Sequence, residues 1–300
     1  MSALLLYGAY GYTGRLIVER AAARSVPLIL AGRDENKLRP LGERHGCEVR
    51  AFGLSAATES LGGVTTVLNA AGPFSKTAAP MVDACLAAGA NYVDITGEID
   101  VFTALHARGN EALAKGIVLL PGAGFDVVPS DCLAAHVHRR LPDAEWLSLV
   151  IGGLEELSRG TAKTAVESIG KGTVVRRGGE FVTLDKPPRG TVDLGNGLTP
   201  TIGMSWGDVA TAYYSTGIPD IDVFFEASEQ LERATGLSAP TRWFMGTALG
   251  QWLAQKAIDR MPPGPDETTR ETAPASCSRT LAPRAASRRA RNSKHRRATS

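Results

Sequence analysis

The sequence predicts an α/β protein: an N-terminal doubly wound parallel sheet, a second α+β domain, and a basic C-terminal segment. Three observations predict this fold. Short apolar runs alternate with helical stretches through the first part of the chain, as they do in doubly wound sheets. A glycine-rich segment joins the first apolar run to the first helical stretch. Near residue 262 the composition changes abruptly to a basic one. We therefore expect domains at 1–135 and 136–261 and a disordered tail at 262–300.

The first apolar run, Ala3 to Tyr7, is typical of a strand buried on both faces of a parallel sheet. The segment Gly8-Ala9-Tyr10-Gly11-Tyr12-Thr13-Gly14 follows it directly. In such a turn Gly8 permits the tight bend, Gly11 lets a pyrophosphate approach the backbone, and Gly14 lets the next helix pack on the sheet. A helix to Ala23 and a strand from Leu28 to Ala31 complete the pattern. Strand, glycine turn, helix and strand together predict a dinucleotide-binding Rossmann domain.

The end of the second strand predicts which dinucleotide binds. NAD-binding proteins place an acidic residue there, on the ribose hydroxyls. Here Gly32 and Arg33 occupy the position, and Asp34 comes later. A guanidinium holds a 2′-phosphate through paired, charge-assisted hydrogen bonds, whereas a carboxylate repels it. We expect NADP as the cofactor, with the alternative that Arg33 is a solvated loop charge.

Further strands are expected at 48–52, 66–70, 92–95 and 117–120, with helices at 35–45, 79–88 and 101–115. The loop after each later strand contains glycine, and ligands of such sheets lie beyond the carboxyl ends of the strands. Two carboxylates, Glu98 and Asp126, fall in these loops. Each either takes part in catalysis or serves as a helix cap or loop anchor. The residues expected to contact the cofactor are Gly8, Tyr10, Gly11, Tyr12, Thr13, Gly14, Arg33, Ala71, Gly72 and Pro73.

In the second half, strands are expected at 147–151 and 223–227, and a hairpin at 174–182 turns at its glycines. Apolar residues at 162, 165, 166 and 169 have helical spacing and indicate core packing, not a cofactor site.

Composition excludes several classes of function. The chain has 300 residues, of which 43% are hydrophobic and 21% charged, and no stretch reaches the ~18 apolar residues of a membrane span. Its four cysteines form no metal-ligand pair and no disulfide framework, which favours a reducing, cytoplasmic location and predicts no metal.

Residues 262–300 hold nine Lys or Arg and three acidic residues, although the net charge of the whole chain is only +2. After Glu271 the chain has no acidic residue and few large apolar ones, so we expect disorder. A basic tail can bind acidic surfaces, but without aromatic side chains for stacking we expect no specific nucleic-acid binding.

Several separated segments resemble the saccharopine dehydrogenase-like oxidoreductases, in particular the trans-acting enoyl reductases. They include Gly8 to Gly14, Ala31-Gly32-Arg33, Asn69-Ala70-Ala71-Gly72-Pro73-Phe74, Tyr92-Val93-Asp94-Ile95-Thr96-Gly97-Glu98, Gly122-Ala123-Gly124-Phe125-Asp126-Val127-Val128-Pro129-Ser130-Asp131, Arg159-Gly160-Thr161 and Trp206 to Pro219. The similarity covers residues 1 to about 265. It implies a Rossmann domain followed by a substrate domain with a mixed sheet, and it implies an enoyl thioester, a lipid-like chain or an amino-acid conjugate as substrate.

We expect hydride transfer between NADPH and a carbon of a small-molecule substrate. Candidate proton donors are Asp126, Glu98, Lys163 and Tyr213. The alternative is an NADP(H)-binding protein without catalysis, either a redox sensor or an inactivated enzyme. A homodimer is left open.

The chain departs from the family pattern after Pro262-Pro263-Gly264-Pro265, where the family continues with further strands and helices. A shift of reading frame is our hypothesis for this change. An incomplete second domain is then expected, with an uncovered sheet edge and an uncovered apolar helix face.

Overall fold

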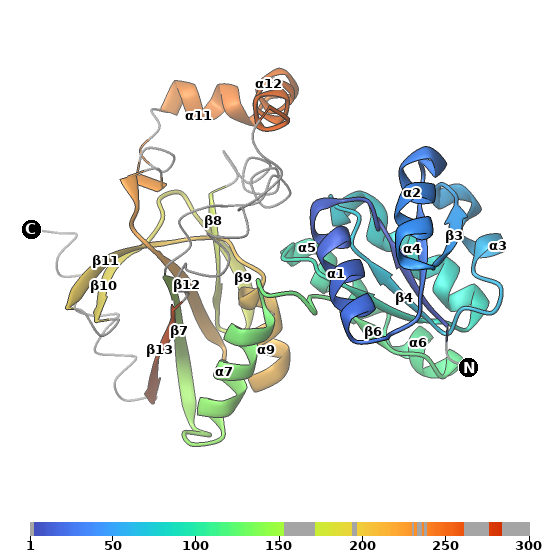
Figure 1. Cartoon of the computed structure of the whole chain (residues 1–300). Coiled ribbons are helices and arrows are strands. Elements are labelled where there is room, and N and C mark those ends of the chain that lie inside the picture. The colour runs from blue at the N-terminus through green and yellow to red at the C-terminus, as the bar shows by residue number, and fades with distance from the viewer. Residues whose placement is uncertain are drawn as a thin grey trace, which may run out of the picture. The chain divides into compact units, whose positions relative to one another are not determined.

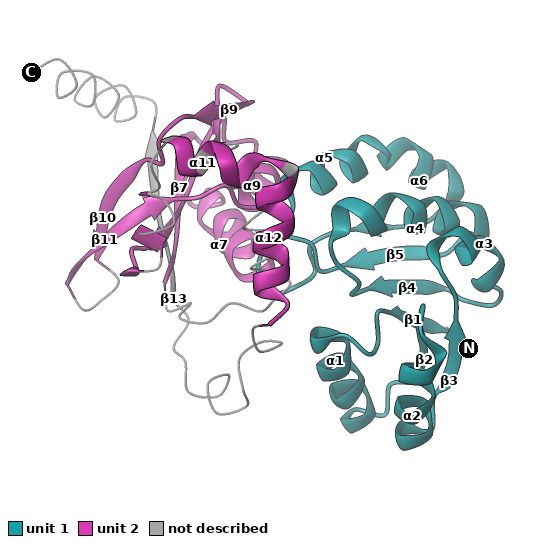
Figure 2. Cartoon of the chain, turned by 90° about the horizontal axis from the view of Figure 1, so that it is seen from above, with its two compact units in different colours: residues 1–126 teal, residues 127–300 magenta. Residues whose placement is uncertain are grey.

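The structure, a computed structural model, describes residues 3–152, 172–193, 197–229, 231–232, 236, 239–260 and 276–283. The chain divides into two compact units, residues 1–126 and 127–300 (Figure 2). The finer domain boundaries expected from the sequence stay predictions.

The first unit contains a six-stranded parallel sheet. Its strands are β1 (Leu4–Tyr7), β2 (Leu28–Gly32), β3 (Glu48–Ala51), β4 (Thr66–Asn69), β5 (Asn91–Asp94) and β6 (Leu119–Leu120). They lie in the order β3-β2-β1-β4-β5-β6, and every neighbouring pair is parallel. This is the strand order of a dinucleotide-binding sheet. The predicted fold of this unit is therefore confirmed.

Helices cover both faces of this sheet (Figure 2). They are α1 (Tyr12–Ala23), α2 (Glu35–His45), α3 (Ala57–Ser60), α4 (Phe74–Ala88), α5 (Ile99–Ala107) and α6 (Gly109–Lys115). Leu6 packs in one core with Val18 of α1 and Leu38 of α2. Leu5, its neighbour along β1, packs in the other core with Met81 of α4. Because successive side chains of a strand point to opposite faces, a continuous apolar run fills both cores.

Two helices differ from their predicted bounds. The single helix expected at 101–115 is two helices, α5 and α6, separated at Arg108. The Arg108 guanidinium pairs with Asp83 of α4 at 2.7 Å and with Glu111 of α6 at 2.8 Å. Helix α4 begins at Phe74, five residues before the expected start at Ala79, and continues through Pro80.

The second unit contains a mixed sheet (Figure 1). Its strands are β7 (Ala144–Gly152), β8 (Thr173–Arg177), β9 (Glu180–Leu184), β10 (Arg189–Asp193), β11 (Leu198–Gly203), β12 (Asp220–Glu226) and β13 (Ser276–Pro283). The order is β10-β11-β12-β7-β13, with β8 joined to β12 and β9. Strands β7 and β12 are parallel, and the other described pairs are antiparallel.

Four helices of this unit are described: α7 (Val128–His138), α9 (Asp208–Thr216), α11 (Ala239–Gly246) and α12 (Ala248–Ile258). Helices α7 and α9 pack together, and both contact the sheet. The expected hairpin is confirmed as β8–β9, which turns at Gly178 and Gly179, both with positive φ. The expected helix around 162–169, and Lys163 within it, lie outside the described residues.

The basic segment departs from the expected disorder at residues 276–283. These residues form β13, which pairs antiparallel with β7, for example Cys277 with Ile151 and Arg279 with Leu149. Strand pairing uses main-chain groups, so it needs little apolar surface from the added segment. An uncovered sheet edge was expected in this domain, and the structure shows that β13 pairs with one side of β7.

Across the described helices, none is both long and apolar enough to cross a membrane.

Candidate functional site

The glycine turn after β1 is held by main-chain contacts. Gly8 has a φ of +90°, and its N–H donates to the carbonyl of Ala31 at 2.8 Å. Gly11 N–H donates to the carbonyl of Gly8 at 2.9 Å. A Cβ on Gly8 would lie 2.9 Å from the nitrogen of Ala71 in the loop after β4. The turn thus packs against the ends of both neighbouring strands, and the expected need for glycine at position 8 is confirmed.

Helix α1 starts against this turn. A Cβ on Gly14 would overlap the carbonyl oxygen of Gly8 and lie 2.9 Å from the Cα of Ala9. Gly11 is the N-cap residue, and no side chain caps the helix. The start of α1 is therefore not closed by a capping side chain. Uncapped N–H groups beside a glycine turn are a cradle that fits the pyrophosphate of a dinucleotide.

Tyr10, Arg33 and Lys37 gather at the end of β2. The Tyr10 ring lies over Gly32, where a Cβ would come within 2.7 Å of it, and Lys37 Nζ is 5.6 Å from the ring centroid. The side chain of Arg33 is exposed, and in the described part of the chain it makes no ion pair. The hydrogen bond from Lys37 lowers the pKa of Asp34, and the two side chains form an ion pair of 3.1 Å. The carboxylate is thus neutralised by Lys37, while Arg33 stays available for an anion.

Lys37 was missed by the sequence analysis. Lys37 follows Arg33 by four residues and lies in the first turn of α2, and this spacing could have indicated a second cation near Arg33.

A buried hydrogen-bond network links the loop after β4 to β5. Asn69 Nδ2 donates to Thr77 Oγ1 and to Tyr92 Oη, both at 3.2 Å. Asn69 Oδ1 accepts from the N–H of Ala71 at 3.1 Å, and Thr77 Oγ1 donates to the carbonyl of Ala71 at 2.7 Å. Ala71 is thereby held on both sides. The next residues, Gly72 and Pro73, lead into α4.

Asp94 extends the same network to the loops after β5 and β6. Its Oδ2 accepts from Tyr92 Oη at 2.8 Å. Its Oδ1 accepts from the N–H of Thr96 at 3.0 Å and from the N–H of Gly122 at 2.8 Å. The side chain has no exposed surface, and burial raises its pKa. Asn69 and Asp94 were quoted in the sequence analysis as parts of motifs, but their structural role was missed.

Glu98, one expected proton donor, immediately precedes α5, and its carboxylate lies at the start of α4. Its Oε1 accepts from the N–H of Phe74 at 2.9 Å, and its Oε2 accepts from the N–H of Ser75 at 2.7 Å. Both carboxylate oxygens therefore cap the helix, which matches the loop-anchor alternative. A catalytic role for Glu98 stays a prediction.

Asp126, the second expected donor, ends the loop after β6. Its side chain is half-buried, and burial raises its pKa. A Cβ on Gly97 would lie 3.9 Å from Asp126 Oδ2. The loops after β5 and β6 therefore meet at this carboxyl group.

Tyr213, on α9 of the second unit, packs on a buried cation. The guanidinium carbon of Arg176 is 4.0 Å from the centroid of the Tyr213 ring and 4.1 Å from that of Phe181. Arg176 Nε donates to the carbonyl of Val209 at 2.9 Å. Tyr213 thus has a structural contact, and its expected catalytic role is untested.

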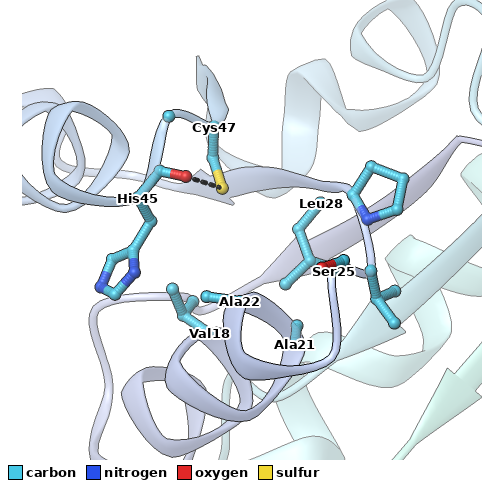
Figure 3. Close-up of a pocket in the computed structure, with 10 residues that line it drawn as sticks. Val18, Ala21, Ala22, Ser25, Leu28, His45 and Cys47 are labelled. Atoms are coloured by element: carbon cyan, nitrogen blue, oxygen red, sulfur yellow. Dashed lines mark hydrogen bonds between the residues drawn. The ribbon is translucent and has the colours of Figure 1, made fainter.

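A cavity of about 300 Å³ lies between the end of α1 and the start of β2 and β3 (Figure 3). Its lining includes Val18, Leu28, His45 and Cys47, and Cys47 Sγ donates to the carbonyl of His45 at 3.6 Å. Leu28 is the first residue of β2, so this cavity opens at the amino ends of the strands. The glycine turn lies at their carboxyl ends, so the cavity is not the dinucleotide site.

In the ranges described, no group of three or more His, Cys, Asp or Glu side chains is arranged to hold a metal ion.

The strand order, the glycine turn and the uncapped α1 define the first unit as a dinucleotide-binding domain. Residues 4–120 match the family model described as saccharopine dehydrogenase NADP binding domain. The first unit therefore matches the NADP-binding domain of this family, and the chain is distantly similar to saccharopine dehydrogenase-like oxidoreductases and trans-acting enoyl reductases. The resemblance found in the sequence is thereby confirmed.

Two relatives and one solved structure illustrate the relationship. The chain is 31% identical to a trans-acting enoyl reductase of Mycobacterium leprae over 46% of its own length and 36% of that protein. It is 27% identical to the human saccharopine dehydrogenase-like oxidoreductase over 58% of its length and 47% of that protein. The matches thus span about a third to a half of these relatives. The saccharopine dehydrogenase (L-Glu forming) of Saccharomyces cerevisiae shares the fold, with a TM-score of 0.57 at 13% identity over 90% of this chain and 70% of that one.

Replacing Gly14 with alanine is expected to destabilise the first unit by about 1–3 kcal/mol, because the new methyl group has no room beside the turn. NADPH binding is expected to weaken as well, since α1 must move away from the turn. Gly53→Ala is the control: a Cβ there meets open space at a φ of −88°. Urea unfolding checks both variants, and equal stability of the two would contradict the packing described.

Replacing Asp94 with asparagine is expected to lower the free energy of unfolding by about 1–3 kcal/mol at pH 7. The amide keeps one acceptor oxygen for Thr96 and Gly122 but turns a donor toward Tyr92 Oη, which already accepts from Asn69. Asp100→Asn, on the exposed surface of α5, is the matched control and is expected to change stability by less than about 0.5 kcal/mol. Denaturant unfolding compares the two variants, and an unaltered midpoint for Asp94→Asn would refute the role of the network.

Proposed function

We propose that this chain is an NADP(H)-dependent oxidoreductase that transfers hydride between NADPH and a carbon of a small-molecule substrate. The observation that carries the proposal is the uncapped start of α1 at the glycine turn, with exposed Arg33 at the end of the neighbouring strand. The family model supports an NADP-binding domain at residues 4–120.

In this proposal, different residues of the first unit bind different parts of the cofactor. The N–H groups at the start of α1 would hold the pyrophosphate. Arg33 would pair with the 2′-phosphate, and Lys37 would add positive charge beside the Tyr10 ring. The loop at Ala71, Gly72 and Pro73 would border the reactive end of the cofactor. When bound, NADPH supplies the hydride, and the protein supplies position and electrostatics.

Asp126 is the proton donor that we propose for reduction. Burial raises its pKa, so it keeps its proton to higher pH than an ordinary aspartate does, which is the direction that a proton donor requires. Glu98 is less suited, because both of its oxygens accept hydrogen bonds from main-chain N–H groups of α4.

The substrate class follows from the relatives alone. Trans-acting enoyl reductases and saccharopine dehydrogenase-like oxidoreductases are among the relatives, so an enoyl or lipid-like substrate is the first to test. A cytoplasmic location belongs to the same proposal, since the described cysteines Cys47, Cys85 and Cys132 are free thiols.

A second candidate is an NADP(H)-binding protein without catalysis, a redox sensor or an inactivated enzyme. The capping role of Glu98 favours it, because it removes one free acid from the site. NADPH binding without turnover of any enoyl or carbonyl substrate would select this candidate.

Replacing Arg33 with alanine is expected to raise the Kd for NADPH by about tenfold or more and to leave the Kd for NADH unchanged, because only NADPH carries the 2′-phosphate. Arg39→Ala is the control: Arg39 is exposed on α2 and pairs with Glu35. Fluorescence titration with both nucleotides measures the constants. An equal loss for NADH and NADPH would exclude a 2′-phosphate contact.

Replacing Asp126 with asparagine is expected to lower kcat for reduction by about 10²-fold or more and to leave the Kd for NADPH within about twofold. With the carboxylic acid present, kcat is expected to fall as pH rises through the raised pKa of Asp126, because only the protonated form donates. Asparagine is expected to remove this dependence. A panel of enoyl and carbonyl substrates at several pH values provides the assay, and an unchanged pH profile would exclude Asp126 as the donor.

A further inference from the structure

The cavity between the end of α1 and the start of β2 and β3 is formed by three segments of the first unit: residues 18–22 of α1, residues 25–28 and residues 45–47. Val18 and Leu28 are buried in the core beneath α1 and α2, and Ala21 and Cys47 pack against that core. In Figure 3 the sulfur of Cys47 faces Val18 and Ala22 across open space. The cavity therefore reaches the apolar core of the first unit.

The loops that frame the cavity have defined backbone conformations. Where α1 ends, the N–H of Val26 donates to the carbonyl of Ala21 at 2.9 Å. Where α2 ends, Gly46 has a φ of +64°, and the N–H of Cys47 donates to the carbonyl of Gly42 at 3.0 Å. The side chains around the cavity are therefore held by fixed segments of main chain.

Ser25, in the wall of the cavity, has a strained backbone. Its φ is +54°, and it is the one described residue other than glycine whose φ is positive. A side chain with a Cβ disfavours this left-handed conformation, and such strain is found preferentially at functional sites. The strained residue thus lies at the cavity, which supports a role for the cavity beyond packing.

The charge around the cavity selects the kind of molecule that fits it. Among the described residues that line it there is no Asp, Glu, Lys or Arg. The C-terminal ends of α1 and α2 both border it, and helix C-termini carry partial negative charge. In this part of the structure the carbonyl of His45 accepts a hydrogen bond from the Cys47 thiol alone, at 3.6 Å, and a thiol is a weak donor. The cavity therefore favours an uncharged molecule with an N–H or O–H group and disfavours an anion.

The volume of the cavity, about 300 Å³, limits the size of that molecule. A closed apolar cavity of about 150 Å³ holds one molecule of benzene, so twice this volume suits two fused rings. A helix of a partner protein, about 10 Å across, needs more room. Water finds few hydrogen-bond partners along the apolar wall made by Val18, Ala21, Ala22 and Leu28. A small, mainly apolar compound is the occupant that matches both the volume and the lining.

We propose that this cavity binds an uncharged bicyclic compound with one hydrogen-bond donor, of which indole is the simplest example. The rings lie against Val18, Ala22 and Leu28, and the donor group faces the carbonyl of His45. The cavity opens at the amino ends of the strands, whereas the glycine turn lies at their carboxyl ends. This binding goes beyond the proposed oxidoreductase function and does not depend on it.

Calorimetric titration of indole into the full chain tests the proposal. We expect one site with a Kd of about 0.1–1 mM, with or without saturating NADPH. Indole-3-acetate is expected to bind at least about tenfold more weakly, because its carboxylate meets two helix C-termini and no cation. Indene has the same ring shape without the N–H and is expected to bind about threefold or more weakly.

Ala22→Leu is the variant that blocks the cavity. The larger side chain enters the space between α1 and Cys47, so the Kd for indole is expected to rise by about tenfold or more. Ala23→Leu is the matched control: Ala23 is the next residue of α1, is exposed and is not among the lining residues. Leucine is a good helix former, so both variants are expected to fold, which circular dichroism and urea unfolding check.

The thiol of Cys47 gives a second measure of occupancy. The chain is alkylated with iodoacetamide, and each cysteine is followed by peptide mass spectrometry. Saturating indole is expected to slow alkylation of Cys47 by about fivefold or more, because it covers the sulfur. Cys132, exposed on α7, is the internal reference, and its rate is expected to stay unchanged.

Three outcomes would overturn the proposal. The first is the absence of saturable indole binding to the parent chain. The second is an equal Kd for Ala22→Leu and the parent chain, which would place indole elsewhere. The third is loss of indole binding when NADPH is present, which would assign indole to the dinucleotide site.

Discussion

The buried carboxylate of Asp94 is the contact on which the candidate cofactor site depends. It accepts hydrogen bonds from Tyr92, Thr96 and Gly122, and through Tyr92 it is joined to Asn69. Three loops at the carboxyl ends of neighbouring strands are thereby held in one arrangement. Breaking one of these hydrogen bonds would leave a buried polar group without a partner, which costs free energy. The network therefore holds the loops that border the proposed cofactor site in one conformation.

On the other side of the site, two glycines allow the close packing of the turn. At positions 8 and 14 the missing Cβ lets the turn, the neighbouring strand ends and α1 approach one another closely. The result is a helix start without a side-chain cap, next to an arginine without an ion pair among the described residues. A helix start at a glycine turn and a nearby guanidinium are the two features that suit the binding of a phosphorylated dinucleotide.

The second unit shows how tertiary contacts override local sequence signals. The basic segment lacks the apolar residues of a core, yet residues 276–283 pair with β7 through the main chain. Conversely, α11 and α12 have the apolar residues of core helices, yet five of their large side chains are exposed. Composition indicates how many apolar side chains an element has. Whether these side chains are buried depends on which other elements pack against that element.

The sequence by itself determined the Rossmann architecture, the position of the glycine turn and the position of Arg33 at the end of the second strand. These features depend on residues that are close together in the chain. Apolar periodicity and glycine spacing are local signals, and the strands of the first unit lie within one or two residues of their expected bounds. Only the tertiary structure decided that Glu98 caps α4, that α4 begins at Phe74, and that Asp94 joins loops far apart in sequence. These roles arise from hydrogen bonds between segments that meet only after the sheet has formed, so the sequence left two alternatives open for Glu98 and did not predict the links made by Asp94.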